Sequence, residues 1–426
     1  MNYRPGLKQR ENKMNYYNIM KRLIITSCIL SALLLTVCTN AQNLPSKWKL
    51  TKANKNAFEQ LWEKDSRHIA ATECGNAYIE APNVKAMKEG ECITFHIPVK
   101  DFKAGSCIEF DIMLGVTSPA HEHFHLEYFD NNGWQLRKEV KCVGGRNEPA
   151  FILETIRFTN EVKDGEVLIR LRAAHDFNAE AEVKLMPYGY IGGYIADRGL
   201  ETPKDTLKLG YLGNSFTFVN SADFILKEIA WKEGHYLDMN VNAYPGAYFR
   251  SHLALEGSMD VISHGGYDWF ILQDQSTQAA RFGRDSTTSI SDYTKTISKV
   301  IRYFAPQTRI LLEQTWAFSQ DNYGSFGSFE EFDRCSGKGV SQLSKLAEAE
   351  ISPIAKAFAI IRAERPDIEI YSTDFHHPAA YGAYVKACVN YLMIFRTKFN
   401  SDKADFALDP ATCAYLRSVA ESVVLE

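Results

Sequence analysis

Two short stretches of this sequence hold residue types that can perform nucleophilic catalysis. Ser215 lies in LGYLGNSFTF, where an apolar, strand-like run ends at Gly-Asn before a helix can begin. Asp374 and His377 lie in DFHHPAAYG, on a turn that Pro378 is placed to extend into a helix. This spacing lets the carboxylate bind the imidazole and fix the tautomer that accepts the proton of Ser215. The alternative is a helix-capping serine, an aspartate at a helix N-terminus and a surface histidine.

The sequence around these residues alternates strand-like and helix-like segments. We expect strands at 207–212, 236–243, 269–273, 309–316 and 368–373. We expect helices at 222–233, 251–262, 292–304, 342–362 and 379–395, and a last helix capped by Asp409-Pro410. Five strands that alternate with helices predict an α/β fold with a mostly parallel sheet covered on both faces.

In a sheet of this kind, ligands bind outside the carboxyl ends of the strands. The residues that follow the expected strands are Ser215, Gly246, Gln275, Trp316, and Asp374 with His377. The nucleophile, the base and the orienting acid are therefore expected to meet at one edge of the sheet.

Four motifs in this half of the chain resemble the SGNH/GDSL hydrolase superfamily in order and spacing. They are GNSFT at 213–217, the glycine of YPGAY at 246, LQDQS at 272–276 and DxxHP at 374–378. The resemblance covers about residues 206–426 and implies a flavodoxin-like three-layer α/β/α domain with five parallel strands. It also implies that Ser215 is the nucleophile, that Asp374 and His377 complete a triad, and that the amides of Ser215 and Gly246 form an oxyanion hole.

The sequence departs from the family pattern in two motifs. GNSF replaces the usual GDSL, which keeps the tight turn. In the third motif Gln275 stands where the family has an asparagine. Glutamine donates the same N–H on a side chain that is one methylene longer, so we expect Gln275 to complete the oxyanion hole.

The chain before this half has the pattern of a β domain. From about residue 43 to residue 194, short runs alternate apolar and polar residues between turns such as DNNG and KDG. Alternation of apolar and polar residues leaves one face of each strand exposed to solvent and the other buried, which predicts an antiparallel β-sandwich. We therefore expect a sandwich at 43–194 that could contact carbohydrate, a linker at 195–206 and the hydrolase domain at 207–426.

The N-terminal segment has the features of an export signal. Lys21 and Arg22 precede an apolar run at 23–38, and Thr39 and Ala41 offer small residues to a signal peptidase. We expect a signal peptide at 1–41 and an exported, periplasmic or secreted protein. The alternatives are a retained anchor and a lipoprotein signal at Cys38, but the run is shorter than the roughly 20 residues of a spanning helix.

Composition sets the broad class of protein. The chain has 426 residues, of which 45% are hydrophobic and 23% are charged. This length favours two domains. The net charge of -4 gives no basic excess of the kind that nucleic acid selects. The cysteines have no CxxC pair, so their spacing supports neither a zinc site nor a dense disulfide framework. Two interpretations remain for them: buried thiols, or one or two disulfide bridges within 74–142.

Other residues have both a functional and a structural interpretation. His121, His123 and His125 share one face of an expected strand and could bind a metal, but a polar sheet face is the simpler interpretation. Trp316 and Tyr248 could stack on a sugar as substrate-binding residues, or belong to the core. The segment 325–339 is rich in Gly and Ser and could be a lid or a loop.

Together these features predict an exported serine esterase that removes acetyl or other acyl groups from carbohydrate or another small ester. We expect no cofactor, no metal and no stable membrane span in the mature protein. Two alternatives remain at this stage. One is a glycan-binding protein with weak or no activity, and the other is a lipid or thioester hydrolase with the same triad.

Overall fold

The computed structural model describes an antiparallel β region followed by an α/β region. The described residues are 46–49, 78–81, 83–98, 107–117, 122–130, 132–141, 150–159, 165–181, 183–185, 192–197, 205–319, 323–400, 405 and 408–425. The expected signal peptide, His121 and most of the expected linker lie outside these residues.

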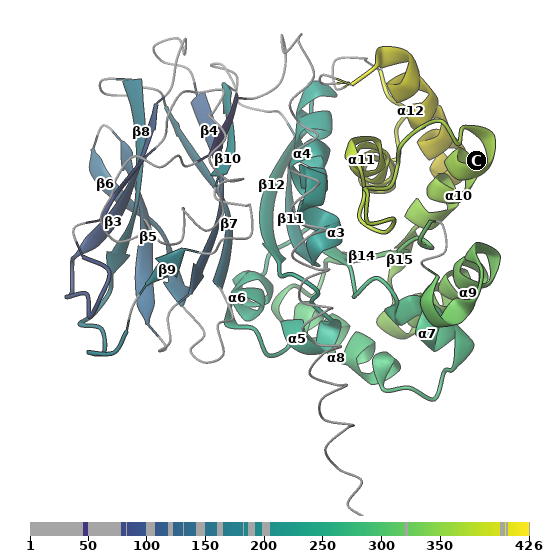
Figure 1. The fold of residues 1–426 in the computed structure, drawn as a ribbon, viewed down its shortest axis with the longest axis horizontal. Coiled ribbons are helices and arrows are strands. Elements are labelled where there is room, and N and C mark those ends of the chain that lie inside the picture. Colours follow the sequence, from purple (N-terminus) through teal and green to yellow (C-terminus); the bar gives the residue numbers. More distant parts are fainter. Residues whose placement is uncertain are drawn as a thin grey trace, which may run out of the picture.

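Two antiparallel sheets face each other in the N-terminal region (Figure 1). The first has the strand order β1-β10-β4-β7, and β9 also pairs with β4. Its strands are β1 (Ser46–Lys49), β4 (Cys107–Thr117), β7 (Ala150–Thr159), β9 (Lys184–Leu185) and β10 (Gly192–Asp197). The second sheet has the order β2-β3-β8-β5-β6. Its strands are β2 (Tyr78–Glu80), β3 (Cys92–Pro98), β5 (His123–Asp130), β6 (Gly133–Lys141) and β8 (Glu166–Ala173).

Apolar and polar side chains alternate along the strands of the second sheet, so one face of this sheet is buried. In β8, Val167, Ile169 and Leu171 are buried, whereas the intervening Arg170 and Arg172 are only half-buried. The apolar face therefore turns toward the first sheet and the charged face turns outward, as the sequence predicted. One boundary was wrong, because β10 continues to Asp197 by pairing with β4, so the strand extends into the expected linker.

The C-terminal region is built on a five-stranded sheet with the order β12-β11-β13-β14-β15. Its strands are β11 (Thr206–Gly213), β12 (Tyr236–Ala243), β13 (Trp269–Leu272), β14 (Arg309–Glu313) and β15 (Glu350–Ser352). All the neighbouring pairs are parallel. Numbered within this region, the order is 2-1-3-4-5, which is the flavodoxin-like arrangement. The predicted fold class is confirmed.

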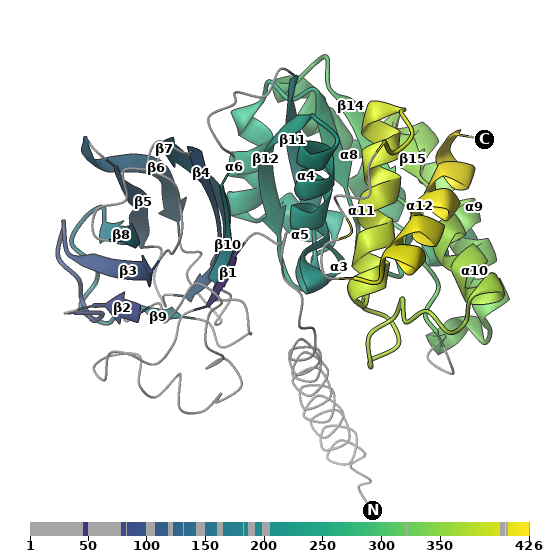
Figure 2. The same ribbon diagram turned by 90° about the horizontal axis from the view of Figure 1, so that it is seen from above.

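Helices cover both faces of this sheet (Figure 2). Trp269 and Ile271 of β13 pack with α4, α10, α11 and α12, whereas Phe270 and Leu272 pack with α6, α8 and α9. The helices are α3 (Ser215–Phe218), α4 (Ala222–Lys232), α5 (Phe249–His252), α6 (Glu256–His264), α7 (Gln278–Arg284), α8 (Ile290–Phe304), α9 (Phe329–Ala347), α10 (Ile354–Glu364), α11 (Ala380–Phe395) and α12 (Pro410–Leu425), with short 3-10 turns η4 (Val219–Ser221) and η5 (Gly324–Phe326). No helix in the described parts of the chain combines the length and apolar character needed to cross a membrane.

The fifth strand lies at a different place from the one expected. The helix expected at 342–362 is interrupted by β15, which pairs with β14 at the edge of the sheet. The strand expected at 368–373 makes only an isolated bridge, Tyr371 to Pro378. Ile368 and Ile370 are buried in the core, so the alternation there reflected burial without sheet pairing. A three-residue edge strand carries too little pattern to be recognised.

The glycine-rich segment at 325–339 is mainly helical. Helix α9 begins at Phe329, and a Cβ atom on its Gly339 would lie 1.8 Å from the carbonyl oxygen of Ala279 in α7. A Cβ on Gly283 of α7 would lie 1.9 Å from the carbonyl oxygen of Cys335. These glycines therefore allow two helices to pack closely, and the expectation of a loop or lid is wrong for most of this segment.

Candidate active site

The turn that presents Ser215 is shaped by the residues on either side of it. Asn214 caps α3, because its side-chain Oδ1 accepts a hydrogen bond from the Phe216 amide at 3.1 Å. Gly213 ends β11 without a side chain, and a Cβ atom there would lie 2.1 Å from Thr217 Oγ1. The chain therefore leaves the strand and enters a short helix within one residue, with Ser215 at the first helical position.

Ser215, His377 and Asp374 form one hydrogen-bonded chain. His377 Nε2 lies 2.8 Å from Ser215 Oγ, and His377 Nδ1 lies 2.6 Å from Asp374 Oδ2. The structure thus brings together the three side chains that the sequence singled out. His377 keeps 12% of its side chain exposed, so the imidazole borders solvent while Asp374 lies beneath it at 6%. This is the order of contacts that a serine nucleophile, a base and an orienting acid require.

The hydrogen bonds around Asp374 favour its ionised form. Burial alone would raise the pKa of this carboxyl, but the hydrogen bond from the His377 ring and the charges of the His377 and His376 imidazoles outweigh it. The pKa of Asp374 therefore lies well below its usual range. Its Oδ1 also accepts hydrogen bonds from the backbone amides of His376 at 3.1 Å and His377 at 2.9 Å. An anionic carboxylate fixed in this way holds the His377 ring in one tautomer.

The loop that carries Asp374 and His377 is held from two directions. From the segment after β14, Trp316 Nε1 donates to the His376 carbonyl at 3.0 Å, and the Ser319 amide donates to the Phe375 carbonyl at 2.8 Å. From the segment after Ser215, Asn220 Nδ2 donates to the Pro378 carbonyl at 2.8 Å. Ser215 and His377 are therefore connected by protein contacts beyond their own hydrogen bond.

Two backbone amides near Ser215 are candidates for the expected oxyanion hole. Gly246 has a φ of 67° in a turn, a conformation that favours glycine. Its turn is joined to that of the nucleophile by Tyr244 N to Gly213 O at 3.2 Å and by Asn214 Nδ2 to Ala247 O at 3.2 Å. Within the described parts of the chain, the amides of Ser215 and Gly246 make no hydrogen bond. They can donate to a substrate oxygen.

Gln275, the third expected donor, is engaged within its own turn. Its Oε1 accepts from the Thr277 amide at 2.9 Å and from Thr277 Oγ1 at 2.8 Å. Its Nε2 donates to Ser276 Oγ at 3.0 Å. An amide nitrogen carries two hydrogens, so one N–H of Gln275 is not used by Ser276. A role in the oxyanion hole remains a prediction for this residue.

Trp316 cannot stack on a substrate, so this prediction was wrong. It is 1% exposed, and its ring lies between Phe216, at a centroid distance of 4.6 Å, and Phe358, at 4.1 Å. Both faces of the indole are covered by parallel rings, and its Nε1 is used by the His376 carbonyl. Trp316 therefore supports the site from below. Tyr248, two residues after Gly246, is only half-buried and stays a candidate for substrate contact.

The buried side chain of Asn214, to which the sequence assigned no role, connects three loops of the site. Asn214 is 2% exposed. Its Oδ1 accepts from Gln273 Nε2 at 2.7 Å, and its Nδ2 donates to the Asp274 carbonyl at 3.2 Å as well as to Ala247. The preference of asparagine for helix N-caps was a usable signal for Asn214. Gln273 lies in the LQDQS motif at 272–276, but only Gln275 of that motif was assigned a role.

Asp274 joins the second and third loops through its side chain. Its Oδ1 accepts hydrogen bonds from the amides of Phe249 at 2.9 Å and Gln275 at 2.8 Å. Burial raises the pKa of the Asp274 carboxyl to about 7, although these two hydrogen bonds act to lower it. The carboxyl thus changes charge near neutral pH, close to the loop that carries Gly246.

His123 and His125, the described members of the expected histidine cluster, do not suit a metal ion. His123 Nδ1 lies 3.0 Å from Glu139, and His125 Nδ1 lies 2.5 Å from an Arg172 nitrogen, whose positive charge opposes a cation. In the described parts of the chain, Asp374, His376 and His377 have ligand atoms within 4.8 Å of one another. His377 already contacts Ser215 and Asp374 already contacts His377, so a metal there would compete with these hydrogen bonds.

Comparisons with known proteins give matches among solved structures. No family model and no curated protein matches the chain. A DUF4886 family protein from Bacteroides uniformis has a TM-score of 0.44 and 17% identity, over 52% of this chain and 95% of that one. A carbohydrate esterase family 2 enzyme plus carbohydrate binding domain from Corynascus thermopiles (Myceliophthora fergusii) has a TM-score of 0.34 and 14% identity, over 75% and 98%. Phospholipase A1 from Streptomyces albidoflavus has a TM-score of 0.34 and 13% identity, over 44% and 98%.

The strand order and the register carry the fold assignment. The position of Ser215 after the first strand of the parallel sheet, and of Asp374 and His377 before α11, is the one that the resemblance to the SGNH/GDSL superfamily implies.

Proposed function

We propose that this chain is an exported serine ester hydrolase that removes acetyl or other acyl groups from carbohydrate. One observation carries the chemistry: Ser215 Oγ lies 2.8 Å from His377 Nε2, and the other ring nitrogen lies 2.6 Å from Asp374. A serine hydroxyl is a weak nucleophile until an adjacent base takes its proton.

The proposed reaction proceeds through an acyl-enzyme. The Ser215 proton passes to His377 Nε2 as Oγ bonds to the ester carbonyl carbon, and the oxyanion receives hydrogen bonds from the amides of Ser215 and Gly246. The tetrahedral intermediate then loses the alcohol, which takes the proton from His377. Water attacks the acyl group by the same route, the acid leaves and Ser215 regains its proton. Only side chains and backbone amides take part, so we expect no cofactor.

The proposed location rests on the N-terminal sequence, and the proposed substrate rests on the pairing of a sandwich with a hydrolase domain. The apolar run after Lys21 and Arg22 favours export. An exported protein with a sandwich of antiparallel sheets is a suitable partner for a glycan, which is an argument by association. For a lipid substrate, we would expect exposed apolar side chains near 325–339, but Phe326, Phe329 and Phe332 are buried together.

The proposal is tested with a panel of small acetyl esters, acetylated oligosaccharides, long-chain lipid esters and thioesters. We expect the wild type to release acetate from acetylated sugars, and Ser215→Ala to lose about 10³-fold or more of the rate. Ser263→Ala, on the exposed surface of α6, is the matched control and should keep full activity. Preference for long acyl chains or thioesters would support the alternative hydrolase, and glycan binding without any turnover would support a binding protein.

A further inference from the structure

A buried ion pair lies directly behind the nucleophile turn. Lys386 of α11 is 1% exposed and Glu313 of β14 is 4% exposed. Lys386 Nζ lies 2.7 Å from Glu313 Oε2. The proposed reaction uses neither residue, although both lie next to elements that carry the triad.

Lys386 reaches the turn itself. Its Nζ donates to the backbone carbonyl of Phe216, the residue after Ser215, at 3.1 Å, and to Gln273 Oε1 at 3.4 Å. Helix α3 has only four residues, so most of its carbonyls lack a partner within the helix. The ammonium group therefore caps a helix that is too short to satisfy its own backbone.

Glu313 ties the same ammonium to the sheet and to α11. Its Oε1 accepts hydrogen bonds from Tyr211 Oη at 2.6 Å and from Asn390 Nδ2 at 2.7 Å. Tyr211 belongs to β11, the strand that ends at the nucleophile turn. The carboxylate is thus fixed by three donors from β11 and α11, and it fixes Lys386 in turn.

Stability alone does not account for a pair in this position. A buried ion pair is often no more stabilising than well-packed apolar residues of similar volume, because both charges lose water. Burial lowers the pKa of Lys386, and the charge of Glu313 acts in the opposite direction. What the pair supplies beyond packing is a directed hydrogen bond to the backbone that follows Ser215.

We propose that Lys386 and Glu313 are positioning residues, which hold the turn so that Ser215 Oγ stays within reach of His377 Nε2. This inference rests on the proposed function of the triad. A displacement of about 1 Å at a reacting group can cost on the order of 100-fold in rate. The pair should therefore act on kcat through Ser215 and leave substrate binding nearly unchanged.

The main test is the double variant Lys386→Met with Glu313→Gln, which leaves no unpaired buried charge. We expect kcat to fall about 10- to 100-fold with KM changed less than about 2-fold. The single variant Lys386→Met should lose more stability than the double variant, because it leaves the Glu313 carboxylate buried without a cationic partner. The matched control is Arg417→Met with Asp405→Asn, which removes a partly buried pair between α12 and the residue at 405 and should keep kcat.

A crystal structure of the Lys386 and Glu313 double variant separates this inference from the proposed function. We expect Ser215 Oγ to leave hydrogen-bonding distance of His377 Nε2, an outcome that does not depend on activity. A double variant with wild-type kcat, or with Ser215 Oγ still in place, overturns the inference. If instead the wild type hydrolyses nothing while the variant still displaces Ser215, the positioning role holds and the proposed function fails.

Discussion

Histidine meets carboxylate in both halves of this molecule, with different consequences. In the sandwich, His96 Nδ1 lies 3.2 Å from Glu166 and His96 Nε2 lies 3.1 Å from Glu80. In the α/β domain, His377 has one nitrogen on Asp374 and the other on Ser215 Oγ. Both ring nitrogens of His96 therefore face carboxylates, whereas one ring nitrogen of His377 faces a hydroxyl that can give up its proton. A candidate base is therefore distinguished by the partner of its second ring nitrogen, which is the Ser215 hydroxyl for His377 and a second carboxylate for His96.

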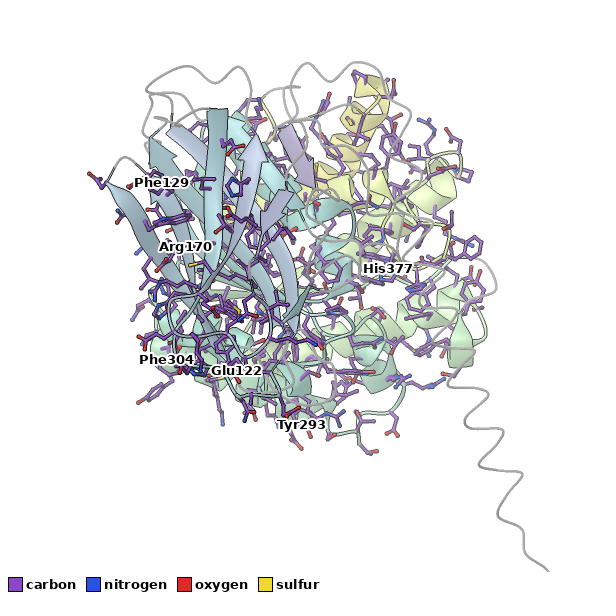
Figure 3. All side chains as sticks on the ribbon, turned by 60° about the vertical axis from the view of Figure 1, so that its left-hand side comes forward. Glu122, Phe129, Arg170, Tyr293, Phe304 and His377 are labelled. Atoms are coloured by element: carbon purple, nitrogen blue, oxygen red, sulfur yellow. The ribbon has the colours of Figure 1, made fainter. Side chains whose placement is uncertain are left out.

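The charged groups of the two halves also differ in where they lie. On the outer face of the sandwich, Glu127 lies 2.6 Å from Arg170 and 2.8 Å from Arg172, and both arginine side chains reach solvent. Figure 3 shows Arg170 on the sandwich and His377 far from it in the α/β domain. In the α/β domain, Lys386 and Glu313 are paired beneath the nucleophile. Glu127 and Glu313 are both buried, so the two halves differ in the cationic partner: the arginines of the sandwich reach solvent and Lys386 does not.

Replacing Asp374 should separate the two kinds of histidine site most clearly. Asp374→Asn removes the charge that fixes the His377 tautomer, so we expect kcat/KM to fall about 10³- to 10⁴-fold. Glu166→Gln makes the same chemical change beside His96 and should leave the rate within about 2-fold. Steady-state kinetics on an acetyl ester measures both. Equal effects from the two substitutions would mean that the comparison does not distinguish the sites.

Removing the Asn214 side chain should have the next largest effect. Asn214→Ala deletes the N-cap of α3 and the links to Gln273 and to the Ala247 and Asp274 carbonyls, so the three loops lose their common contact. We expect about 100-fold lower kcat, since misplacement near the reacting groups can cost this much. We also expect the loss of about 2 kcal/mol of stability, because buried partners are left unsatisfied.

The control for Asn214 lies in the sandwich. Asn178 accepts a hydrogen bond from the Glu180 amide at an exposed turn. Asn178→Ala should change neither the rate nor the unfolding midpoint by a measurable amount. Wild-type kinetics in Asn214→Ala would show that the Asn214 side chain does not position the site.

Gln275 should have a smaller effect than Asn214. Two backbone donors remain in the proposed oxyanion hole without it, so we expect Gln275→Ala to lower kcat by about 10-fold. Gln135→Ala, at a half-buried position in the sandwich, is the matched control. The assay is the initial rate on an acetyl ester at saturating substrate. An unchanged rate would assign Gln275 to the support of its own turn, where Ser276 and Thr277 already engage it.

The smallest expected effect concerns the charge of Asp274. Its carboxyl has a pKa raised to about 7 in the folded protein, above its value in the unfolded chain. Between these two values the folded state binds more protons, so this group lowers stability as pH rises from about 4 to 7. Asp274→Asn keeps an oxygen for the amides of Phe249 and Gln275 but cannot ionise.

The measurement for Asp274 is the unfolding midpoint of both proteins between pH 4 and pH 8. We expect the wild type to lose stability relative to Asp274→Asn as pH rises through this range. Parallel curves would show that the ionisation of this group is not linked to folding.

Much of this fold could be predicted from local sequence patterns. The hydroxyl and the imidazole are 162 residues apart, yet each stands in a recognisable motif, and Ser215 follows the first strand of the parallel sheet as expected. Alternating strands predicted the sandwich, and helical periodicity predicted α4 and α8 closely. These elements carry their own signal because one face of each is buried.

The missed features depend on contacts between distant segments. Glu313 and Lys386 are 73 residues apart, and nothing around either marks a buried pair. β15 is a strand because β14 offers it a partner, and Trp316 is covered because Phe216 and Phe358 approach it from both sides. Such features follow from packing, which local sequence patterns do not encode.

Labelling with a fluorophosphonate tests the central claim, that His377 activates Ser215, most directly. This reagent phosphonylates an activated serine and releases fluoride, and peptide mass spectrometry locates the adduct. We expect one adduct, on Ser215, which is absent in Ser215→Ala and forms at least about 100-fold more slowly in His377→Gln, because the hydroxyl then has no base. His96→Gln should label at the wild-type rate. An adduct on another residue, or labelling of Ser215 at the same rate without His377, would contradict the account.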